Sequence, residues 1–168
     1  MYEVSCSVKQ LLFLVFFLGM VNYLMAKIIE DATHQLQPIP GSIVCCDIYG
    51  VFTHTGIWLN GSVVELAGNG LVRNISPERF LQQRSGSQIF VMGSDSGEVL
   101  ACEHAAAQAH SQIFEYLPYD VITNNCNRFV ATCYGLPQPQ DVTLFNELTD
   151  KLSNFFNKLI VFYPMKRL

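Results

Sequence analysis

The chain has 168 residues, 50% of them hydrophobic and 14% charged, and a formal net charge of −4. This length accommodates one ordinary domain with a hydrophobic core, and the charged share is low against an average of about 25%. The ten lysines and arginines are scattered without a basic run, so the phosphate-neutralising surface of a nucleic-acid-binding protein is missing and no nucleic-acid partner is expected.

An apolar segment runs from Leu11 to Ala26 and is interrupted only by Asn22. It is short for a membrane span, which needs about 20 apolar residues, but long enough for a signal-peptide core or a tilted transmembrane anchor. Residues 1–30 are therefore predicted to form a hydrophobic anchor or signal-like segment, which makes the protein membrane-associated. An alternative start at Met25 would remove this segment and leave a cytoplasmic protein.

The cysteines and histidines lack the spacing of a metal site, because no CxxC pair and no zinc-type ligand pattern occurs. We therefore expect no metal and no other cofactor. Cys45 and Cys46 are adjacent on a predicted strand and should point to opposite faces, so they indicate no simple disulfide framework. The cysteine pattern therefore does not decide between an oxidising and a reducing compartment.

Residues 40–67 are rich in β-branched and aromatic side chains and are broken by Gly and Asn-Gly. This pattern predicts strands at about 42–48, 53–59 and 62–67. The Asn60-Gly61 pair favours a two-residue type I′ turn, which fixes the register of the hairpin. The residues predicted to share one face are His54, Gly56, Trp58, Val63, Glu65 and Ala67.

Within this register Glu65 is diagonal to His54, at a Cα separation of about 7 to 8 Å that long side chains can bridge. Gly56, opposite Glu65, is expected to leave room for the carboxylate. A carboxylate that accepts a ring N–H fixes the tautomer of a histidine and favours its charged form. The alternative is an ordinary cross-strand polar pair on a solvated face.

Further along the chain, Ser76-Pro77 has the composition of a helix start and predicts a short helix to about residue 83. Residues 87–93 are predicted to form a strand. A longer helix is expected to open at 94–98 and to end at about Tyr116, before Leu117-Pro118. Residues 119–123 are predicted to be a short strand or an extended entry.

Cys126 falls in the first turn of the next predicted helix, which Asn124 or Asn125 can cap. Buried cysteines usually behave as small hydrophobes, so an inert thiol is the alternative to a reactive one. At a helix N-terminus, free N–H groups and the helix dipole favour negative charge and lower the pKa of a thiol. The same N–H groups, with the Asn125 side chain, could hold an oxyanion. The core-facing side of this helix carries Phe129, Val130 and Cys133, of which Cys133 should be inert.

After Leu136 the sequence PQPQ breaks the chain, and apolar residues then recur at spacings of three and four. Residues 137–168 are therefore predicted to be a Pro-rich break followed by an amphipathic C-terminal helix. This helix either covers the domain or, because its end is apolar and then carries Lys166 and Arg167, lies at a membrane interface.

Three segments, PGSIV, HTGIWLNGSVVEL and NCNRFV, together resemble the lecithin:retinol acyltransferase-like branch of the permuted papain-like (NlpC-like) thiol enzymes. The resemblance covers about residues 40–135 and places a catalytic domain at 38–136. It implies an α+β fold in which a small antiparallel sheet packs against the helix that carries the nucleophilic cysteine. It also implies that Cys126 is the nucleophile and His54 its general base, with a thioester acyl-enzyme.

Two departures from the family pattern bear on specificity. Vertebrate acyltransferases of this branch have a second histidine where this chain has Glu65, and their motif continues Glu-His-Phe where this chain has Asn127-Arg128-Phe129. Some bacterial members of the wider group are similar in placing a glutamate at the third position. We interpret Cys126, His54 and Glu65 as a variant triad, with Asn125 as oxyanion support.

These residues predict an acyltransferase or hydrolase that acts on ester or amide bonds through a cysteine thioester. The apolar chain ends favour an acyl-lipid substrate and contact with a membrane surface. Two alternatives are a cell-wall or protein amidase or peptidase of NlpC-like type, and a non-catalytic membrane-associated binding module with the same fold.

Overall fold

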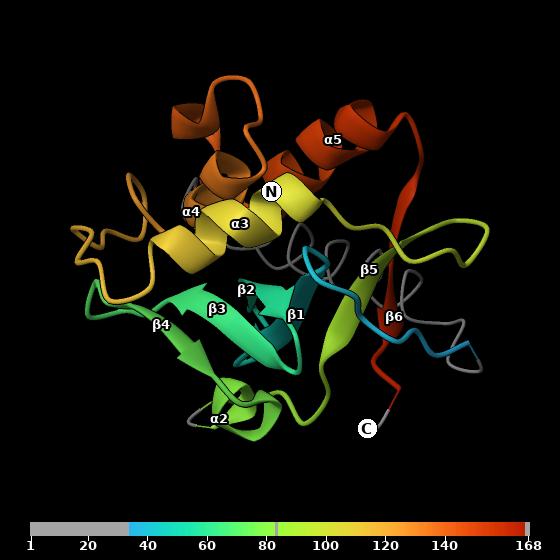
Figure 1. The fold of residues 1–168 in the computed structure, drawn as a ribbon, viewed down its shortest axis with the longest axis horizontal. Helices are drawn as coiled ribbons and strands as arrows, with labels where there is room; N and C mark the ends of the chain where they lie inside the picture. The colour runs from blue at the N-terminus through green and yellow to red at the C-terminus, as the bar shows by residue number, and fades with distance from the viewer. Residues whose placement is uncertain (1–33, 83, 167–168) are drawn as a thin grey trace, which may run out of the picture.

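The computed structural model describes residues 34–166 except residue 83. These residues form a mixed α+β fold with one six-stranded antiparallel sheet and four α-helices (Figure 1). The predicted N-terminal anchor or signal-like segment, residues 1–30, lies outside the described residues. Within the described ranges, no helix is both long enough and apolar enough to cross a bilayer.

The sheet order is β4-β3-β2-β1-β5-β6. The strands are β1 (Ile43–Ile48), β2 (Phe52–Leu59), β3 (Ser62–Leu66), β4 (Val72–Ile75), β5 (Phe90–Ser94) and β6 (Ile160–Pro164). The helices are α2 (Pro77–Leu81), α3 (Glu103–Ser111), α4 (Cys126–Cys133) and α5 (Phe145–Phe156), with a short 3-10 turn η1 (Pro139–Asp141). In Figure 1, α3, α4 and α5 lie on one side of the sheet and α2 on the other.

The hairpin of β2 and β3 has the predicted turn and register. Asn60 and Gly61 both have positive φ, at 47° and 93°, as a type I′ turn requires. Leu59 pairs with Ser62 and Trp58 with Val63. The predicted register is therefore confirmed at the turn, and this register decides which side chains of β2 and β3 share a face.

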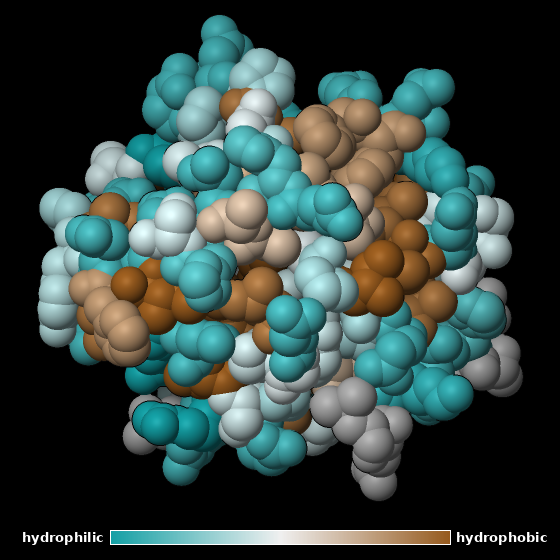
Figure 2. Space-filling model, in the orientation of Figure 1, coloured by the Kyte–Doolittle hydropathy of each residue, from teal (hydrophilic) through white to brown (hydrophobic). Residues whose placement is uncertain are grey.

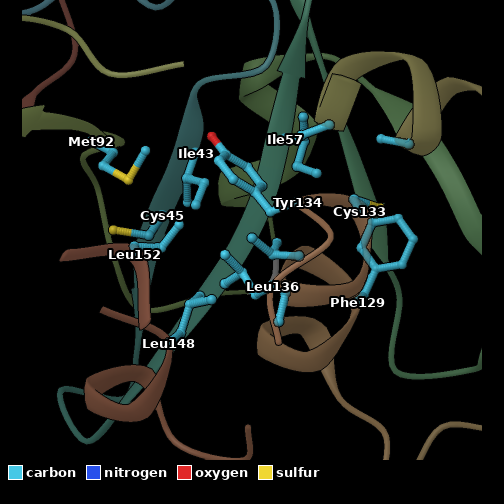
Figure 3. Packing of buried hydrophobic residues seen from close by; sticks show 14 of the residues in the cluster. Ile43, Cys45, Ile57, Met92, Phe129, Cys133, Tyr134, Leu136, Leu148 and Leu152 are labelled. Atoms are coloured by element: carbon cyan, nitrogen blue, oxygen red, sulfur yellow. The ribbon is translucent and has the colours of Figure 1, made fainter. Parts of the chain in front are cut away.

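The sheet separates two apolar cores, because successive residues of each strand point to opposite faces. Cys45 contributes to the larger core and Cys46 to the smaller one, as their adjacency predicts. The larger core lies between the sheet and the helices α3, α4 and α5. Figure 3 shows its packing, with Ile43, Cys45, Ile57 and Met92 from the strands against Phe129, Cys133, Tyr134, Leu136, Leu148 and Leu152.

Two predicted elements have different bounds in the structure. The helix expected to open at 94–98 begins only at Glu103. Residues 94–98 instead form a tight turn, in which the Ser94 N–H donates to the Glu98 carbonyl and Gly97 has a φ of 77°. A left-handed residue at this position cannot start a helix, and Gly is the residue that adopts it at least cost. The strand predicted over 87–93 begins at Phe90.

Within the segment 119–123, predicted to be a short strand or an extended entry, residues 121–123 form a turn between Asp120 and Asn124, which pair in an isolated β-bridge. The Asp120 Oδ1 accepts hydrogen bonds from the Ile122 N–H, the Thr123 N–H and the Thr123 hydroxyl. An aspartate that binds the backbone two and three residues ahead stabilises such a turn. The chain therefore reverses direction immediately before Asn125 and Cys126.

The C-terminal segment contains a helix and then a strand. The predicted amphipathic helix is α5, which buries Leu148 and Leu152. It ends at Phe156, and Asn157 follows with a positive φ of 51°. The apolar run beyond it is not helical: it forms β6, which pairs with β5 at the edge of the sheet and lies beside it in Figure 1.

Large apolar side chains remain on the surface at several loops and helix ends. Figure 2 shows brown, apolar areas on the two sides of one face, separated by polar residues. The exposed large hydrophobic residues in the described ranges include Tyr49, Val51, Phe52, Phe114, Tyr116, Val121, Ile122, Leu144, Phe155 and Leu159.

Candidate active site

Cys126 is the first residue of α4, and Asn125 is the N-cap of that helix. The Asn125 Oδ1 accepts hydrogen bonds from the N–H groups of Asn127, at 3.0 Å, and Arg128, at 3.2 Å. An asparagine in this role is one of the strongest helix starts available. The cap fixes the position of Cys126 at the end of α4 where the helix dipole favours negative charge.

His54 and Glu65 form a buried pair across the sheet. The His54 Nε2 lies 2.6 Å from the Glu65 Oε2, and both side chains are almost fully buried. The His54 ring also packs against Phe80 of α2, with ring centroids 5.3 Å apart. Because Nε2 donates to the carboxylate, Nδ1 is the ring nitrogen that remains for a thiol. The pair is therefore buried rather than an exposed pair on a solvated face.

Cys126 lies against β2 at His54 and Thr55. Burial opposes the thiolate form, but a hydrogen bond with His54, its charge, and contacts from the Thr55 N–H and hydroxyl lower the pKa of the Cys126 thiol. Burial likewise opposes the charged form of His54, but its hydrogen bonds to Cys126 and Glu65 raise its pKa. Both shifts favour a thiolate–imidazolium pair, which is the reactive form of a catalytic thiol.

Glu65 is held as an anion by three cationic or potentially cationic side chains. Its Oε1 accepts from the Arg73 Nε at 2.8 Å, and its Oε2 lies 2.8 Å from Arg84 Nη2. The buried environment would raise the pKa of the carboxyl, but the hydrogen bond and charge of His54, with Arg84 and Arg73, lower it to about 2. Glu65 is therefore ionised and can only accept hydrogen bonds from His54.

The space beside Gly56 is bounded most closely by Val63, Val64 and Phe80. A Cβ atom there would lie 2.5 Å from the Val63 Cγ1 and 3.3 Å from the Phe80 ring. The missing side chain therefore makes space for the packing of Val63 and Phe80. Phe80 in turn contacts the His54 ring, so the absence of a side chain at Gly56 supports the position of the histidine.

Asn125 does not offer a free donor for an oxyanion, contrary to the expectation. Its Nδ2 donates to the Val121 carbonyl at 2.7 Å and to the Thr143 carbonyl at 2.8 Å, which uses both amide hydrogens. The capped N–H groups of Asn127 and Arg128 are also engaged. The Cys126 N–H has no acceptor among the described residues, so it is the N–H group of this helix start that remains free to bind an anion.

The contacts of Asn127 and Arg128 beside the thiol were not predicted from the sequence. The Asn127 Nδ2 donates to the Thr143 carbonyl at 3.1 Å, and its Oδ1 accepts from the Thr55 hydroxyl at 3.1 Å. The Arg128 Nε donates to the Val142 carbonyl at 3.3 Å. The polar residues of the NCNR motif therefore bind the segment after the Pro-rich break to the start of α4.

Arg73, Arg84 and Tyr119 were not predicted to belong to the site. The two arginines bind Glu65. Tyr119 is half-buried; burial and the charge of Cys126 raise the pKa of its phenol. These residues come from β4, the segment after α2 and the loop before α4. Only the Glu65–Arg73 cross-strand pair could have been inferred, from the register of β3 and β4.

Three buried thiols of the described chain, Cys45, Cys46 and Cys133, differ from Cys126. Burial raises the pKa of Cys133 and of Cys46 to about 12 and raises that of Cys45 well above its usual value. These cysteines are unreactive in their buried, uncharged form. The raised pKa of the Cys133 thiol agrees with the expectation that this cysteine is inert. Within the described ranges, no group of three His, Cys, Asp or Glu side chains could hold a metal ion.

Comparisons of this chain with models of known protein families, with curated proteins and with solved structures find no match. The function is therefore argued from the geometry around Cys126.

Proposed function

We propose that the protein is a cysteine-dependent acyltransferase or hydrolase that acts on ester or amide bonds through a thioester. The observation that carries this proposal is one continuous chain of contacts: the thiol at the start of α4 interacts with His54, and the His54 Nε2 lies 2.6 Å from Glu65. A nucleophile, a base within hydrogen-bond reach and a third group that orients the base are the features of an activated nucleophile.

In the proposed reaction the Cys126 thiolate attacks a carbonyl carbon, and a sulfur–carbon bond forms. The Cys126 N–H stabilises the negative charge that develops on the carbonyl oxygen. His54 then gives its proton to the leaving alcohol or amine, and the carbon–oxygen or carbon–nitrogen bond breaks. Water or an acceptor alcohol or amine next attacks the thioester, and His54 accepts the proton of that nucleophile. The carbon–sulfur bond then breaks, which releases the acyl product and restores the Cys126 thiolate.

The order of these elements supports a permuted papain-like fold of the lecithin:retinol acyltransferase-like type. The chain supplies the histidine strand β2 first, then the acid on β3, and the nucleophile on the later helix α4. The antiparallel sheet and α4 are in contact through β2. This arrangement is the one that the resemblance of the three sequence segments implies.

Exposed apolar residues on the two loops that lead into the site favour an acyl-lipid substrate and a membrane surface as partner. Val51 and Phe52 lie two to three residues before His54, and Val121 and Ile122 lie four to five residues before Cys126; all four are exposed. The Ile122 carbonyl accepts a hydrogen bond from Thr143, which is next to exposed Leu144. Apolar surface of this kind is typical of sites that bind apolar ligands or membranes.

Labelling with a thiol-reactive probe at neutral pH tests the nucleophile. We expect Cys126 to label faster than free cysteine, and the His54→Ala variant to label at least about tenfold more slowly at this position. Cys126→Ala should abolish the fast phase, whereas Cys133→Ala should leave it intact. A wild-type protein that labels no faster than free cysteine would refute the enzyme and favour a non-catalytic binding module.

Mass spectrometry of the intact protein tests the substrate class. After exposure to a lipid extract we expect an acyl-sized mass increase that the Cys126→Ala variant does not acquire. Hydrolysis of a peptidoglycan fragment without any acyl adduct would instead identify an amidase. The His54→Ala variant should accumulate less adduct because its thiol is less ionised.

A further inference from the structure

Glu65 is bound by more positive charge than the orientation of one histidine requires. Arg73, its cross-strand partner, places Nε 2.8 Å and Nη2 2.7 Å from Oε1. Arg84 places Nη2 2.8 Å from Oε2, the same oxygen that His54 contacts at 2.6 Å. The carboxylate is fully buried, so these contacts are weakly screened by solvent.

The Arg84 side chain is fixed in this position by further contacts. Its guanidinium also donates to the Phe80 carbonyl and lies 5.0 Å from the centroid of the Phe80 ring. The side chain is only 12% exposed, against 35% for that of Arg73. Phe80 also packs against His54, so Arg84, Phe80 and His54 form one packed unit around Glu65.

The charges at the site explain why two arginines are useful. A lone buried carboxylate would stabilise the imidazolium strongly, and His54 would then hold its proton too tightly to return it to a leaving group. General acid–base catalysis is most effective when the pKa of the catalytic group is near the working pH. Two guanidinium groups on Glu65 turn this carboxylate from a net anion into the centre of a group with one net positive charge.

We propose that Arg84 and, more weakly, Arg73 are positioning residues that cancel the charge of Glu65, so that Glu65 orients His54 without trapping it in the protonated state. This inference rests on the proposed function, since it assigns His54 a proton-transfer role. Among the residues that the structure describes, the other charged or titratable groups near the pair are Cys126 of α4, Cys46 and Asp47 of β1, and Tyr119 of the loop before α4.

The test is a histidine NMR titration of the full chain in a Cys126→Ala background, where the thiolate no longer contributes to the pKa of His54. The His54→Ala variant assigns the ring signal. We expect Arg84→Gln to raise the pKa of His54 by about one unit, because a positive charge that opposes the imidazolium is removed. Arg73→Gln should give a smaller rise in the same direction.

Matched variants separate this effect from loss of structure or of general charge. Arg84→Lys keeps the charge and should return the pKa of His54 most of the way to the value of the parent. Lys158→Gln removes one positive charge from the exposed pair with Glu98 and should leave the pKa unchanged. If Arg84→Gln does not fold, the inference is tested with Arg73→Gln, which should also raise the pKa of His54 above that of the parent.

A folded Arg84→Gln protein whose His54 pKa equals that of Lys158→Gln, or falls below it, overturns the inference. That result would leave the proposed function standing, because probe labelling of Cys126 is measured separately in the wild-type chain. The opposite combination is also informative. If Cys126 does not label fast but the arginine variants shift the pKa of His54 as expected, the enzyme is refuted, while the control of the His54 charge by the arginines is supported.

Discussion

Asn125 engages both its side-chain oxygen and its side-chain nitrogen with the neighbouring backbone. The oxygen accepts from two N–H groups of α4, and the nitrogen donates to the carbonyls of Val121 and Thr143. One side chain thus joins the turn before the thiol, the helix that carries it and the segment that follows the Pro-rich break. Its role is to position Cys126, and contact with the substrate is not needed for it.

Two substitutions of Asn125 should separate its role in positioning Cys126 from the effect of charge on the pKa of the Cys126 thiol. Asn125→Ala removes the cap and the two part-buried hydrogen bonds to the Val121 and Thr143 carbonyls, so we expect the free energy of unfolding to fall by about 2 to 4 kcal/mol. Asn125→Asp keeps the cap acceptor but adds a negative charge beside Cys126, which should raise the pKa of the thiol. Chemical denaturation and the pH dependence of probe labelling measure the two effects.

The control for this pair of variants is Asn124→Ala, one residue away and outside the cap. The Asn124 Nδ2 donates to the Pro118 carbonyl near the surface, so Asn124→Ala should lower the free energy of unfolding by less than Asn125→Ala does. Equal labelling rates for Asn125→Asp and the wild type at every pH would contradict the electrostatic account of the Cys126 environment.

At the scale of elements, the β2–β3 hairpin determines which residue faces His54. A shift of one residue in the register would turn Glu65 to the opposite face of the sheet. The type I′ turn at Asn60-Gly61 prevents this shift, because it requires positive φ at both residues and fixes the pairing next to it. The geometry of a two-residue turn therefore controls a contact at the far end of the hairpin.

Gly61→Ala should destabilise the protein through backbone strain alone. The φ of 93° is unfavourable for alanine, while no atom lies within 4 Å of a Cβ placed there, so we expect a loss of about 1 kcal/mol. Gly68→Ala is the matched control, because its surroundings are equally open and its φ is not positive. Thermal denaturation of both variants measures the difference, and equal melting temperatures would contradict the turn assignment.

At the scale of the whole molecule, the buried ionic cluster links stability to pH. Glu65 has a pKa of about 2 in the folded protein, below the ordinary value of 4.5. A group with a lowered pKa in the folded state stabilises the fold above its unfolded pKa, and this contribution is lost as the pH falls toward the folded value. The stabilisation by Glu65 is therefore complete above about pH 4.5 and disappears between there and about pH 2.

Unfolding measured by denaturant at several pH values tests this link. The wild type should lose on the order of 3 kcal/mol from the Glu65 contribution between pH 5 and pH 2. Glu65→Gln should be less stable at neutral pH and show a correspondingly flatter dependence on pH. Glu98→Gln, at an exposed glutamate, should retain the wild-type dependence of the unfolding free energy on pH. If Glu65→Gln also retained this dependence, Glu65 would be excluded as its source.

The sequence by itself determined the local parts of the candidate site. The Asn-Gly turn, the alternation of strand residues and the asparagine before Cys126 each act over a few residues, so they predict the hairpin register, the shared face of His54 and Glu65, and the start of α4. Tertiary structure alone decided what surrounds them. Arg84, Asn127, the 142–143 segment and β6 reach their positions through contacts between residues far apart in the chain, which no local pattern encodes. The tight turn at 94–98 was misassigned for a related reason: its residues also fit a helix start, and the pairing with β5 and the backbone of Gly97 decided between the two.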